Sequence, residues 1–423
     1  MFVTGSSRSE LTGQDAVTIA YASDGSTLWS RRYDGPAHGD DGGVDLGLSA
    51  QGDTVYIAGS AGGPSSSQIL VIAYDATNGA RVWATRIGSQ LLFDEVAALA
   101  VSHDGSRVFV TGVRRYFDDS DIRTIALDAS SGSVVWTRRF EGSSQQPSAP
   151  TDLRVSPDGS LVVMTGWFQA AGTDPSSTQA VTVAYEAADG SRRWAQRFDG
   201  NMPSGQDRAS GVEIAPDSSA VYVAMTSESA TNDLDYLTFG YDAGTGAELW
   251  RHRYNGPDGH ADEPGAIAID AAGTSVFVTG RSLVETVGSV QVFDYATVAI
   301  DAGTGHRIWA TRYDAGIGGS DEAVDVGVGP GGGKVFVTGT SEGLINGVSS
   351  STDIVTMGLA AASGIELGLR RYNGPCNFVD RAAALAIGPN GSRVYVTGTT
   401  NCFDPDTSGD IATIAYRTQT PSR

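Results

Sequence analysis

The chain has 423 residues, of which 55 are glycine and 40% are hydrophobic. Its formal net charge is −21, from 49 acidic and 28 basic residues, so its electrostatic field repels nucleic acid and anionic membranes. No run of 18 apolar residues occurs, which argues against insertion into a membrane. Met1 opens directly into a strand-like stretch, so we expect no signal peptide within this sequence.

An aliphatic stretch that closes with Thr-Gly, or a close variant, recurs eight times along the chain with a period in the fifties. The copies are Val3-Thr4-Gly5, Ile57-Ala58-Gly59, Val110-Thr111-Gly112, Met164-Thr165-Gly166, Val223-Ala224-Met225, Val278-Thr279-Gly280, Val337-Thr338-Gly339 and Val396-Thr397-Gly398. Such a period, built from short strands and turns, is typical of a radial or stacked β repeat. Because the repeat fills the chain, we expect one domain over residues 1–423.

Each full repeat divides into four strands, a to d. In one copy they cover residues 96–101, 107–112, 122–128 and 133–140, with Gly-containing turns that suit hairpins. Strand a is rich in Ala and Gly, as an innermost strand must be thin. Four antiparallel strands cannot bury both faces alone, and packing around an axis solves this. The sequence therefore predicts an all-β fold, a β-propeller of four-stranded antiparallel blades.

The expected number of blades depends on how the first and last strands of the sequence are assigned to repeats. The sequence starts at a strand b and stops after a strand c. We therefore prefer eight blades, of which the first lacks its inner strand and the last lacks its outer strand. Seven blades, with residues 1–24 as surplus strands, are the alternative.

The segment Tyr74–Trp83 (YDATNGARVW) resembles the tryptophan-docking repeat of PQQ-like propellers. Similar segments cover residues 127–136, 185–194, 241–250 and 300–309. The resemblance implies that one tryptophan per repeat packs between adjacent blades: Trp29, Trp83, Trp136, Trp194, Trp250 and Trp309. Leu367 is expected to replace tryptophan at the seventh docking position. The half-repeat of strands a and b is similar to bacterial propeller repeats of the SBBP type. Such repeats occur in enzymes and in binding proteins, so the resemblance carries the fold and not the function.

Length variation is concentrated in the loops between strands b and c, which share a face with the d–a loops. Residues 167–178, 281–293 and 341–352 are insertions there, and insertions on one face usually mark a binding surface. Loop aromatic residues could stack on a sugar or a protein partner. They are Tyr116, Phe117, Trp167, Phe168, Phe378 and Phe403.

An aspartate recurs just before strand a, at Asp41, Asp94, Asp207, Asp262, Asp321 and Asp380. We interpret these residues mainly as caps, each accepting backbone N–H bonds from its own loop. A ring of carboxylates that binds a cation is the alternative.

Charged residues interrupt the small residues of strand a at Asp152, Arg154 and Glu213. The repeat places these three side chains close together on neighbouring blades. A buried ion-pair network that joins the blades is one interpretation. The alternative is a polar site with Asp152, Arg154 and Glu213 as candidate catalytic residues.

The last b–c loop contains Asp404, Asp406, Ser408 and Asp410, spaced as in the first half of a D-x-D-x-S-G calcium loop. Its flanks are strands, and position twelve is Ala415 rather than Glu. Calcium is the candidate ligand, and an ordinary Asp-rich turn is the alternative.

The only cysteines are Cys376 and Cys402, in loops of one face of the last blade. A disulfide between them would indicate an oxidising compartment, whereas two free thiols are the alternative. Quinone-dependent members of the family carry adjacent cysteines over the cofactor. This chain has none, which argues against binding of PQQ.

Two functions remain open. The first is a non-catalytic, monomeric, secreted or cell-surface propeller that binds a protein or a glycan through its variable loops. The second is an enzyme, lyase-like or lactonase-like, that acts on a small molecule at the channel mouth; this alternative rests on analogy between folds. A cytoplasmic location is compatible with either function.

Overall fold

A computed structural model describes residues 1–9, 13–63, 66–89, 92–116, 119–140, 142, 146–170, 177–200, 205–229, 233–257, 259–287, 290–316, 319–345, 348–401 and 409–418. The secondary structure of these residues consists of strands and turns, without a helix. No helix that could cross a membrane is therefore present in this part of the chain.

The chain forms two compact units. Unit 1 comprises Met1–Ile214 with Gly244–Gly246, and unit 2 comprises Ala215–Ala243 with Ala247–Arg423. The strands of unit 1 are β1 Phe2–Ser9, β2 Gly13–Tyr21, β3 Thr27–Tyr33, β4 Gly42–Leu48, β5 Thr54–Gly63, β6 Ser66–Asp75, β7 Arg81–Ile87, β8 Phe93–Val101, β9 Arg107–Tyr116, β10 Asp119–Asp128, β11 Val134–Phe140, β12 Ser148–Val155, β13 Leu161–Gln169, β14 Thr178–Glu186, β15 Arg192–Phe198 and β16 Asp207–Ile214.

Unit 2 contains the remaining strands. They are β17 Ala220–Glu228, β18 Leu234–Asp242, β19 Glu248–Tyr254, β20 Asp262–Ile269, β21 Ser275–Val287, β22 Val290–Asp301, β23 Arg307–Tyr313, β24 Asp321–Val328, β25 Lys334–Ile345, β26 Val348–Ala360, β27 Glu366–Tyr372, β28 Asp380–Ile387, β29 Arg393–Thr400 and β30 Asp410–Arg417.

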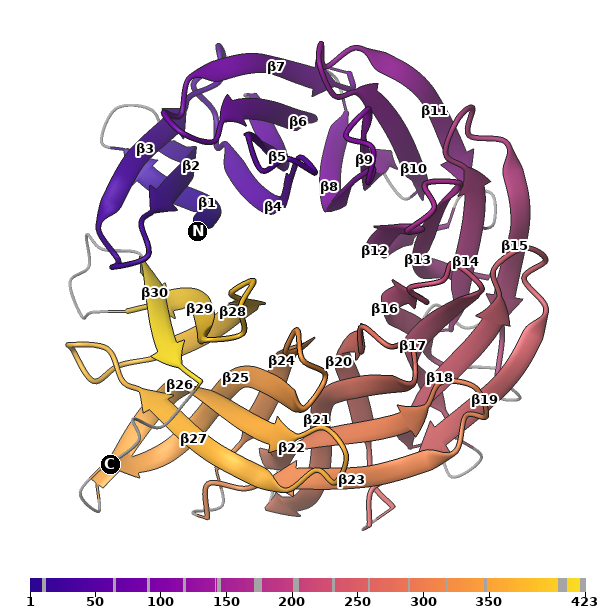
Figure 1. Cartoon of the computed structure of the whole chain (residues 1–423), viewed down its shortest axis with the longest axis vertical. Coiled ribbons are helices and arrows are strands. Elements are labelled where there is room, and N and C mark those ends of the chain that lie inside the picture. Colours follow the sequence, from indigo (N-terminus) through magenta and orange to yellow (C-terminus); the bar gives the residue numbers. More distant parts are fainter. Residues whose placement is uncertain are drawn as a thin grey trace. The chain divides into compact units, whose positions relative to one another are not determined.

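Antiparallel pairing follows the order of the chain. Strands β4–β7 and β8–β11 form two four-stranded repeats, which one parallel bridge between Ser67 and Phe93 joins into a single sheet. Strands β12–β15, β20–β23 and β24–β27 each form a four-stranded sheet. Strands β16–β19 continue the same order along the chain, with β17 pairing β18 and β18 pairing β19. The first repeat has only β1-β2-β3 and the last only β28-β29-β30, so the strands make up eight repeats. In Figure 1, β4, β8 and β12 lie along one side of the unit 1 sheets, and β7, β11 and β15 along the other.

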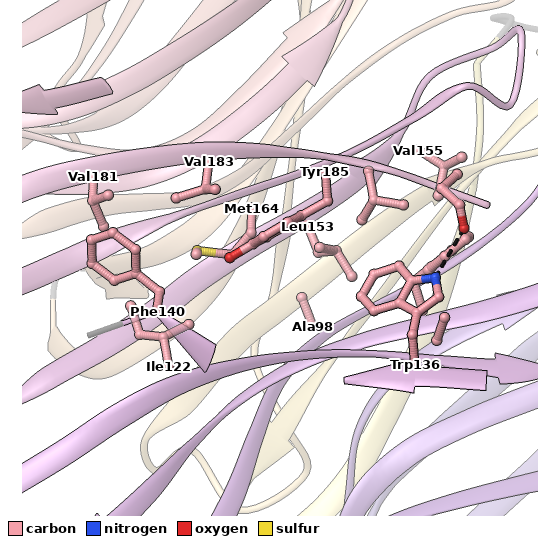
Figure 2. Packing of buried hydrophobic residues seen from close by; sticks show 14 of the residues in the cluster. Ala98, Ile122, Trp136, Phe140, Leu153, Val155, Met164, Val181, Val183 and Tyr185 are labelled. Atoms are coloured by element: carbon pink, nitrogen blue, oxygen red, sulfur yellow. Dashed lines mark hydrogen bonds between the residues drawn. The ribbon is translucent and has the colours of Figure 1, made fainter. Parts of the chain in front are cut away.

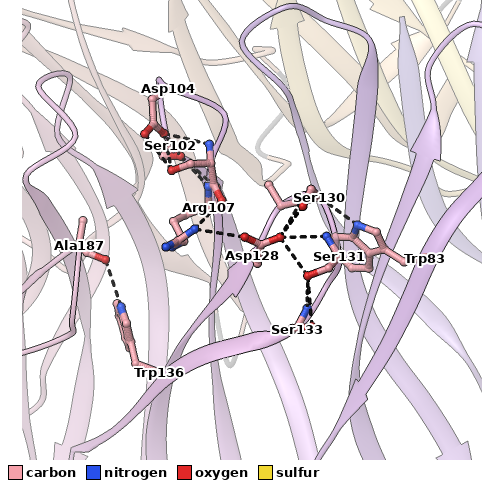
Figure 3. Close-up of polar contacts among 12 residues, drawn as sticks. Trp83, Ser102, Asp104, Arg107, Asp128, Ser130, Ser131, Ser133, Trp136 and Ala187 are labelled. Carbon is pink, nitrogen blue, oxygen red and sulfur yellow. Dashed lines mark hydrogen bonds and ion pairs between the residues drawn. The ribbon is translucent and has the colours of Figure 1, made fainter.

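Turns between strands c and d have the chemistry that the sequence predicts. The Asp75 carboxylate accepts hydrogen bonds from the backbone N–H groups of Thr77 and Asn78, at 2.8 and 3.1 Å. Gly79 closes this turn with a φ of 71°, in the left-handed region that glycine occupies without strain. Asp128 repeats the arrangement with Ser130 and Ser131 (Figure 3).

Within each unit, docking tryptophans reach across to the next repeat. The indole of Trp83 donates a 2.9 Å hydrogen bond to the carbonyl of Ala129, and Trp136 donates a 3.1 Å bond to Ala187 (Figure 3). Trp136 also lies between two aromatic rings, with centroids 5.8 Å from Phe109 and 6.3 Å from Tyr185. The docking predicted from the family resemblance is confirmed at these positions.

The hydrophobic core is divided among the contacts between successive sheets. One cluster contains Trp136, Leu153, Met164 and Tyr185, drawn from two successive repeats of unit 1, β8–β11 and β12–β15 (Figure 2). Strands b and c are buried on both faces; in β14, for example, seven of the nine residues are buried. This double burial explains the nearly continuous aliphatic runs from which the strands were predicted.

The expectation for the seventh docking position is wrong by one residue. Gly358 pairs with Gly368, as Ala299 pairs with Trp309 in the preceding blade. Gly368 therefore occupies the tryptophan position. Leu367 is the residue before Gly368, on the opposite face of the strand, and is 54% exposed. The turn glycine Gly364, which matches Gly305, and the strand end at Tyr372, which matches Tyr313, both place Gly368 in the register of Trp309.

Candidate functional site

The three charged residues predicted on the inner strands do come together within unit 1. Arg154 on β12 donates hydrogen bonds to the Asp152 carboxylate at 2.5 Å and to Glu213 of β16 at 3.3 Å. The side chains of Asp152, Arg154 and Glu213 are 15%, 39% and 22% exposed, so solvent reaches the edge of the cluster.

Asp152 accepts a pair of backbone hydrogen bonds that recurs in another repeat of unit 1. Its Oδ1 accepts the Leu153 N–H at 2.7 Å, and its Oδ2 accepts the Val212 N–H of the neighbouring inner strand at 3.0 Å. Asp45 makes the same pair of bonds to Leu46 and Leu99. Asp152 Oδ2 therefore joins two inner strands, while Oδ1 is bonded to Leu153 and Arg154 of its own strand, as expected for a structural residue.

The electrostatics of the cluster couple one guanidinium to two carboxyl groups. Burial raises the pKa of Glu213 and of Asp152 above their ordinary values, and the nearby Arg154 guanidinium opposes this rise without cancelling it. Burial lowers the pKa of Arg154, but Asp152 and Glu213 raise it by more. Arg154 therefore stays charged and partly neutralises the two carboxylates.

The aspartates before strand a act as caps for their own loops. Asp41 accepts the Gly35 N–H at 2.5 Å, and its second oxygen accepts the Gly62 N–H at 2.9 Å. Asp380 accepts the Gly374 N–H at 2.5 Å in the same way. The cap interpretation is confirmed for these residues.

Two of these caps also belong to groups of three carboxylates that the sequence reading missed. Asp15, Asp34 and Asp41 form one such group in unit 1, and their ligand oxygens lie within 4.8 Å of one another. The Asp15 carboxylate pairs with Arg32 at 2.9 Å, and Asp34 contacts His38 Nδ1 at 2.7 Å. Three carboxylates and one guanidinium leave a charge of about −2 when His38 is neutral, which a divalent cation would balance.

The second group, Asp294, Asp314 and Asp321, holds the same repeat positions in unit 2 and has the same 4.8 Å limit. Asp294 pairs with Arg312 at 3.3 Å. Asp321 is fully buried; its Oδ2 accepts the Ala315 N–H at 2.9 Å, and its Oδ1 has no hydrogen-bond partner within the described residues. Burial raises the pKa of Asp321 to about 6, and Asp294 and Asp314 add to that rise. These oxygens could hold a calcium ion.

The predicted aromatic surface is only partly available. Phe168 is 1% exposed and packs against Phe140, with ring centroids 5.9 Å apart, so it is a core residue that presents no ring face to a ligand. Trp167, its neighbour on β13, is half-buried and stacks with the Arg208 guanidinium 4.8 Å from its ring centroid. Alternation along a strand explains the difference, since successive side chains point to opposite faces.

Several predicted site residues cannot be placed. Phe117, Cys402, Phe403, Asp404, Asp406 and Ser408 lie outside the described residues, as does the side chain of Tyr116. Asp410 is the first residue of β30 and is exposed. Cys376 is disulfide-bonded, whereas its expected partner Cys402 is among the residues just named.

Comparisons with known proteins support the class of fold. Residues 13–182, less than half of the chain, match a family model described as the outer membrane protein assembly factor BamB. The C-terminal WD40 domain of Sif2 has a TM-score of 0.59 at 11% identity, over 98% of this chain and 92% of that one. A europium-containing methanol dehydrogenase has a TM-score of 0.57 at 12% identity, over 95% and 81%. None of the curated proteins matches the sequence.

The sheets, the docking tryptophans and these similarities define the chain as a β-propeller with PQQ-like repeats. A hydrazine synthase of Kuenenia stuttgartiensis is also similar, with a TM-score of 0.53 at 13% identity over 91% of this chain and 97% of that one. Enzymes and WD40 domains thus share this architecture. At such low identity the likeness concerns the fold alone.

Proposed function

We propose that this propeller is a non-catalytic binding protein that takes a protein or glycan partner on its b–c loops. The observation that carries the proposal is the length of two hairpins in unit 2. Strands β21 and β22 have 13 and 12 residues, and β25 and β26 have 12 and 13, whereas the outer strands β23 and β27 have 7. The hairpins therefore extend past their own blades.

Contacts at the base of the β21–β22 hairpin hold it in place and so stabilise the proposed binding surface. Arg281 donates to Glu263 at 2.8 Å and to Glu322, on the neighbouring sheet, at 2.9 Å. Its guanidinium also lies 4.6 Å from the ring centroid of Phe293 on the paired strand. A bulge between Leu283 and Glu285 then bends the outer part of the hairpin, as bulges do where a surface is redirected.

Site-specific photo-crosslinking tests this proposal. A photoreactive residue at Glu285, exposed on the hairpin, should yield defined adducts in extracts of the native host or on a glycan array. The same residue at His306, exposed in a c–d turn, is the matched control. Equal labelling from both positions, or none from either with no glycan bound, would overturn the proposal.

An oxidising location, in the cell envelope or outside the cell, accompanies this function. Its support is the disulfide of Cys376, since stable disulfides are typical of such compartments. Calcium is the cation we propose for the described aspartate groups, with Asp404, Asp406, Ser408 and Asp410 as a further candidate loop. All of these positions offer the hard oxygen ligands that calcium prefers.

The alternative function is an enzyme that uses Asp152, Arg154 and Glu213. The internal pairing of these residues favours the binding protein, because Arg154 pairs with both carboxylates and Asp152 also accepts two backbone N–H groups of inner strands. Replacing Arg154 with Ala separates the two. A folded variant that loses a measured turnover would support the enzyme, and a destabilised variant would support a structural ion pair.

A further inference from the structure

Unit 2 contains a cavity at the position where other blades carry a docking indole. Gly368 holds that position, and a Cβ atom built on it would meet no atom within 4 Å. The cavity has a volume of about 470 Å³, within the usual range for small-molecule sites. Its lining includes Lys334, Phe336, Gly368, Arg370, Tyr416 and Thr418.

The walls of this cavity correspond to the aromatic partners of tryptophan elsewhere. Phe336 occupies the strand position of Phe277, whose ring centroid lies 5.9 Å from that of Trp309. Tyr416 occupies the position of Tyr185, which lies 6.3 Å from Trp136. An aromatic ring that enters above Gly368 would therefore meet the pair of rings that holds an indole in other blades.

The cavity also retains the hydrogen-bond acceptor of a docking site. Thr418 follows β30 as Ala361 follows β26, and its N–H donates to Ser392 O as that of Ala361 donates to Gly333 O. The carbonyl of Ala361 accepts the indole N–H of Trp309 at 2.8 Å. At the cavity, the carbonyl of Thr418 instead accepts a 3.0 Å hydrogen bond from Lys334 Nζ.

Charge distinguishes this cavity from the rest of the surface. Lys334 is the only lysine in a chain of net charge −21. Arg370 and Arg417 join it in the lining, where the described residues include no acidic one. The hydroxyl oxygen of Tyr416 is buried and has no hydrogen-bond partner among the described residues. Basic groups and an unpaired hydroxyl are groups that a carboxylate would satisfy.

We propose that this cavity, the Gly368 socket, binds a small planar aromatic acid of the size of an indole carboxylate. The ring lies between Phe336 and Tyr416, and its N–H donates to Thr418 O in place of Lys334. The released ammonium then pairs with the ligand carboxylate. The socket does not depend on the b–c loops, so this inference stands independently of the proposed function.

Calorimetric titration with indole-3-acetate tests the socket, with 3-methylindole as the neutral probe of similar shape. Wild-type protein should bind the acid at least about tenfold more tightly than the neutral ring, because a charge-assisted hydrogen bond is lost with the carboxylate. Lys334→Met should remove most of that preference. Arg107→Met, at the same strand position of another blade, should leave it unchanged.

Filling the socket covalently gives an independent test. Gly368→Trp restores the residue of the other blades, and we expect it to abolish binding of the acid while raising the unfolding temperature. The proposal is overturned if wild-type protein binds neither probe, or if a folded Gly368→Trp variant binds as wild type does. Should that variant not fold, equal affinity of wild type and Lys334→Met for the acid would overturn it as well.

Discussion

The indole Nε1 of Trp309 donates a 2.8 Å hydrogen bond to the carbonyl of Ala361, 52 residues further along the chain. The same contact links Trp29 to Ala76 and Trp250 to Ala302. Each bond ties the outer strand of one repeat to the end of strand c in the next. Stability is therefore expected to depend on these contacts more than on any single sheet, as in other repeat proteins.

Replacing Trp309 with Ala should destabilise unit 2 by about 3 to 5 kcal/mol, because it leaves a cavity in the core and an unpaired carbonyl. The free energy of unfolding in urea measures this change. Ile308→Ala is the matched control, since the neighbouring side chain is 45% exposed and should matter by less than about 1 kcal/mol. Similar losses in both variants would contradict the docking role.

A second prediction concerns two adjacent aromatic residues. Phe168→Ala should lower the free energy of unfolding by about 3 to 5 kcal/mol, because its ring is buried against Phe140. Trp167→Ala should have a much smaller effect on stability, because that ring is half-buried and contacts Arg208. Urea titration of both variants decides the matter. If Trp167→Ala proved the more damaging, the assignment of Phe168 to the core would be wrong.

Repetition explains what could be predicted from the sequence. The strand order, the docking tryptophans and the loop caps recur in several repeats. A wrong assignment in one repeat can therefore be recognised by comparison with the others. Asp41 and Asp380, for example, show the same capping geometry in the first and last loops of their kind. The joining of Arg154 with Asp152 and Glu213 was also predictable, because the repeat sets which inner-strand positions are neighbours.

Features that depend on a single copy were missed for physical reasons. The docking position of β27 was assigned to Leu367 instead of Gly368, so the cavity at Gly368 was not foreseen. Phe168 was expected in a loop, but β13 continues to Gln169, so Phe168 follows the alternation of the strand and points into the core. The Asp294 group brings together residues of β22, of the loop after β23 and of β24, which no local spacing reveals.

A third prediction concerns pH. Burial raises the pKa of Asp262 and of Asp321 to about 6, above the usual value of 3.8. The folded state therefore holds these protons more tightly, so the stability they contribute is full below pH 4 and is lost as the pH rises through 6. Asp321→Asn should remove part of this loss and be stabilising by about 1 to 3 kcal/mol at pH 7 in the presence of chelator. Unfolding free energies at pH 4, 5, 6 and 7 test the trend; an unchanged slope in the variant would contradict it.

The final prediction is the response to calcium. Millimolar calcium should raise the unfolding temperature relative to chelator, because a cation balances the charge of about −2 at Asp294, Asp314 and Asp321 with Arg312. A site filled to about a hundred times its dissociation constant adds about 2.7 kcal/mol. Asp314→Asn leaves two carboxylates and should reduce the shift, and Asp34→Asn should do the same in the Asp15 group.

A further variant makes the opposite change and adds a carboxylate to a group that has only two. Asn255 precedes a glycine after β19, as Asp34 does after β3, so Asn255→Asp creates a third group with Asp235 and Asp262. We expect this variant to add to the calcium response and to lose stability in chelator, since it places a new carboxylate beside two buried ones. A calcium shift that is the same in wild type, Asp314→Asn and Asn255→Asp would show that these aspartates serve only as caps.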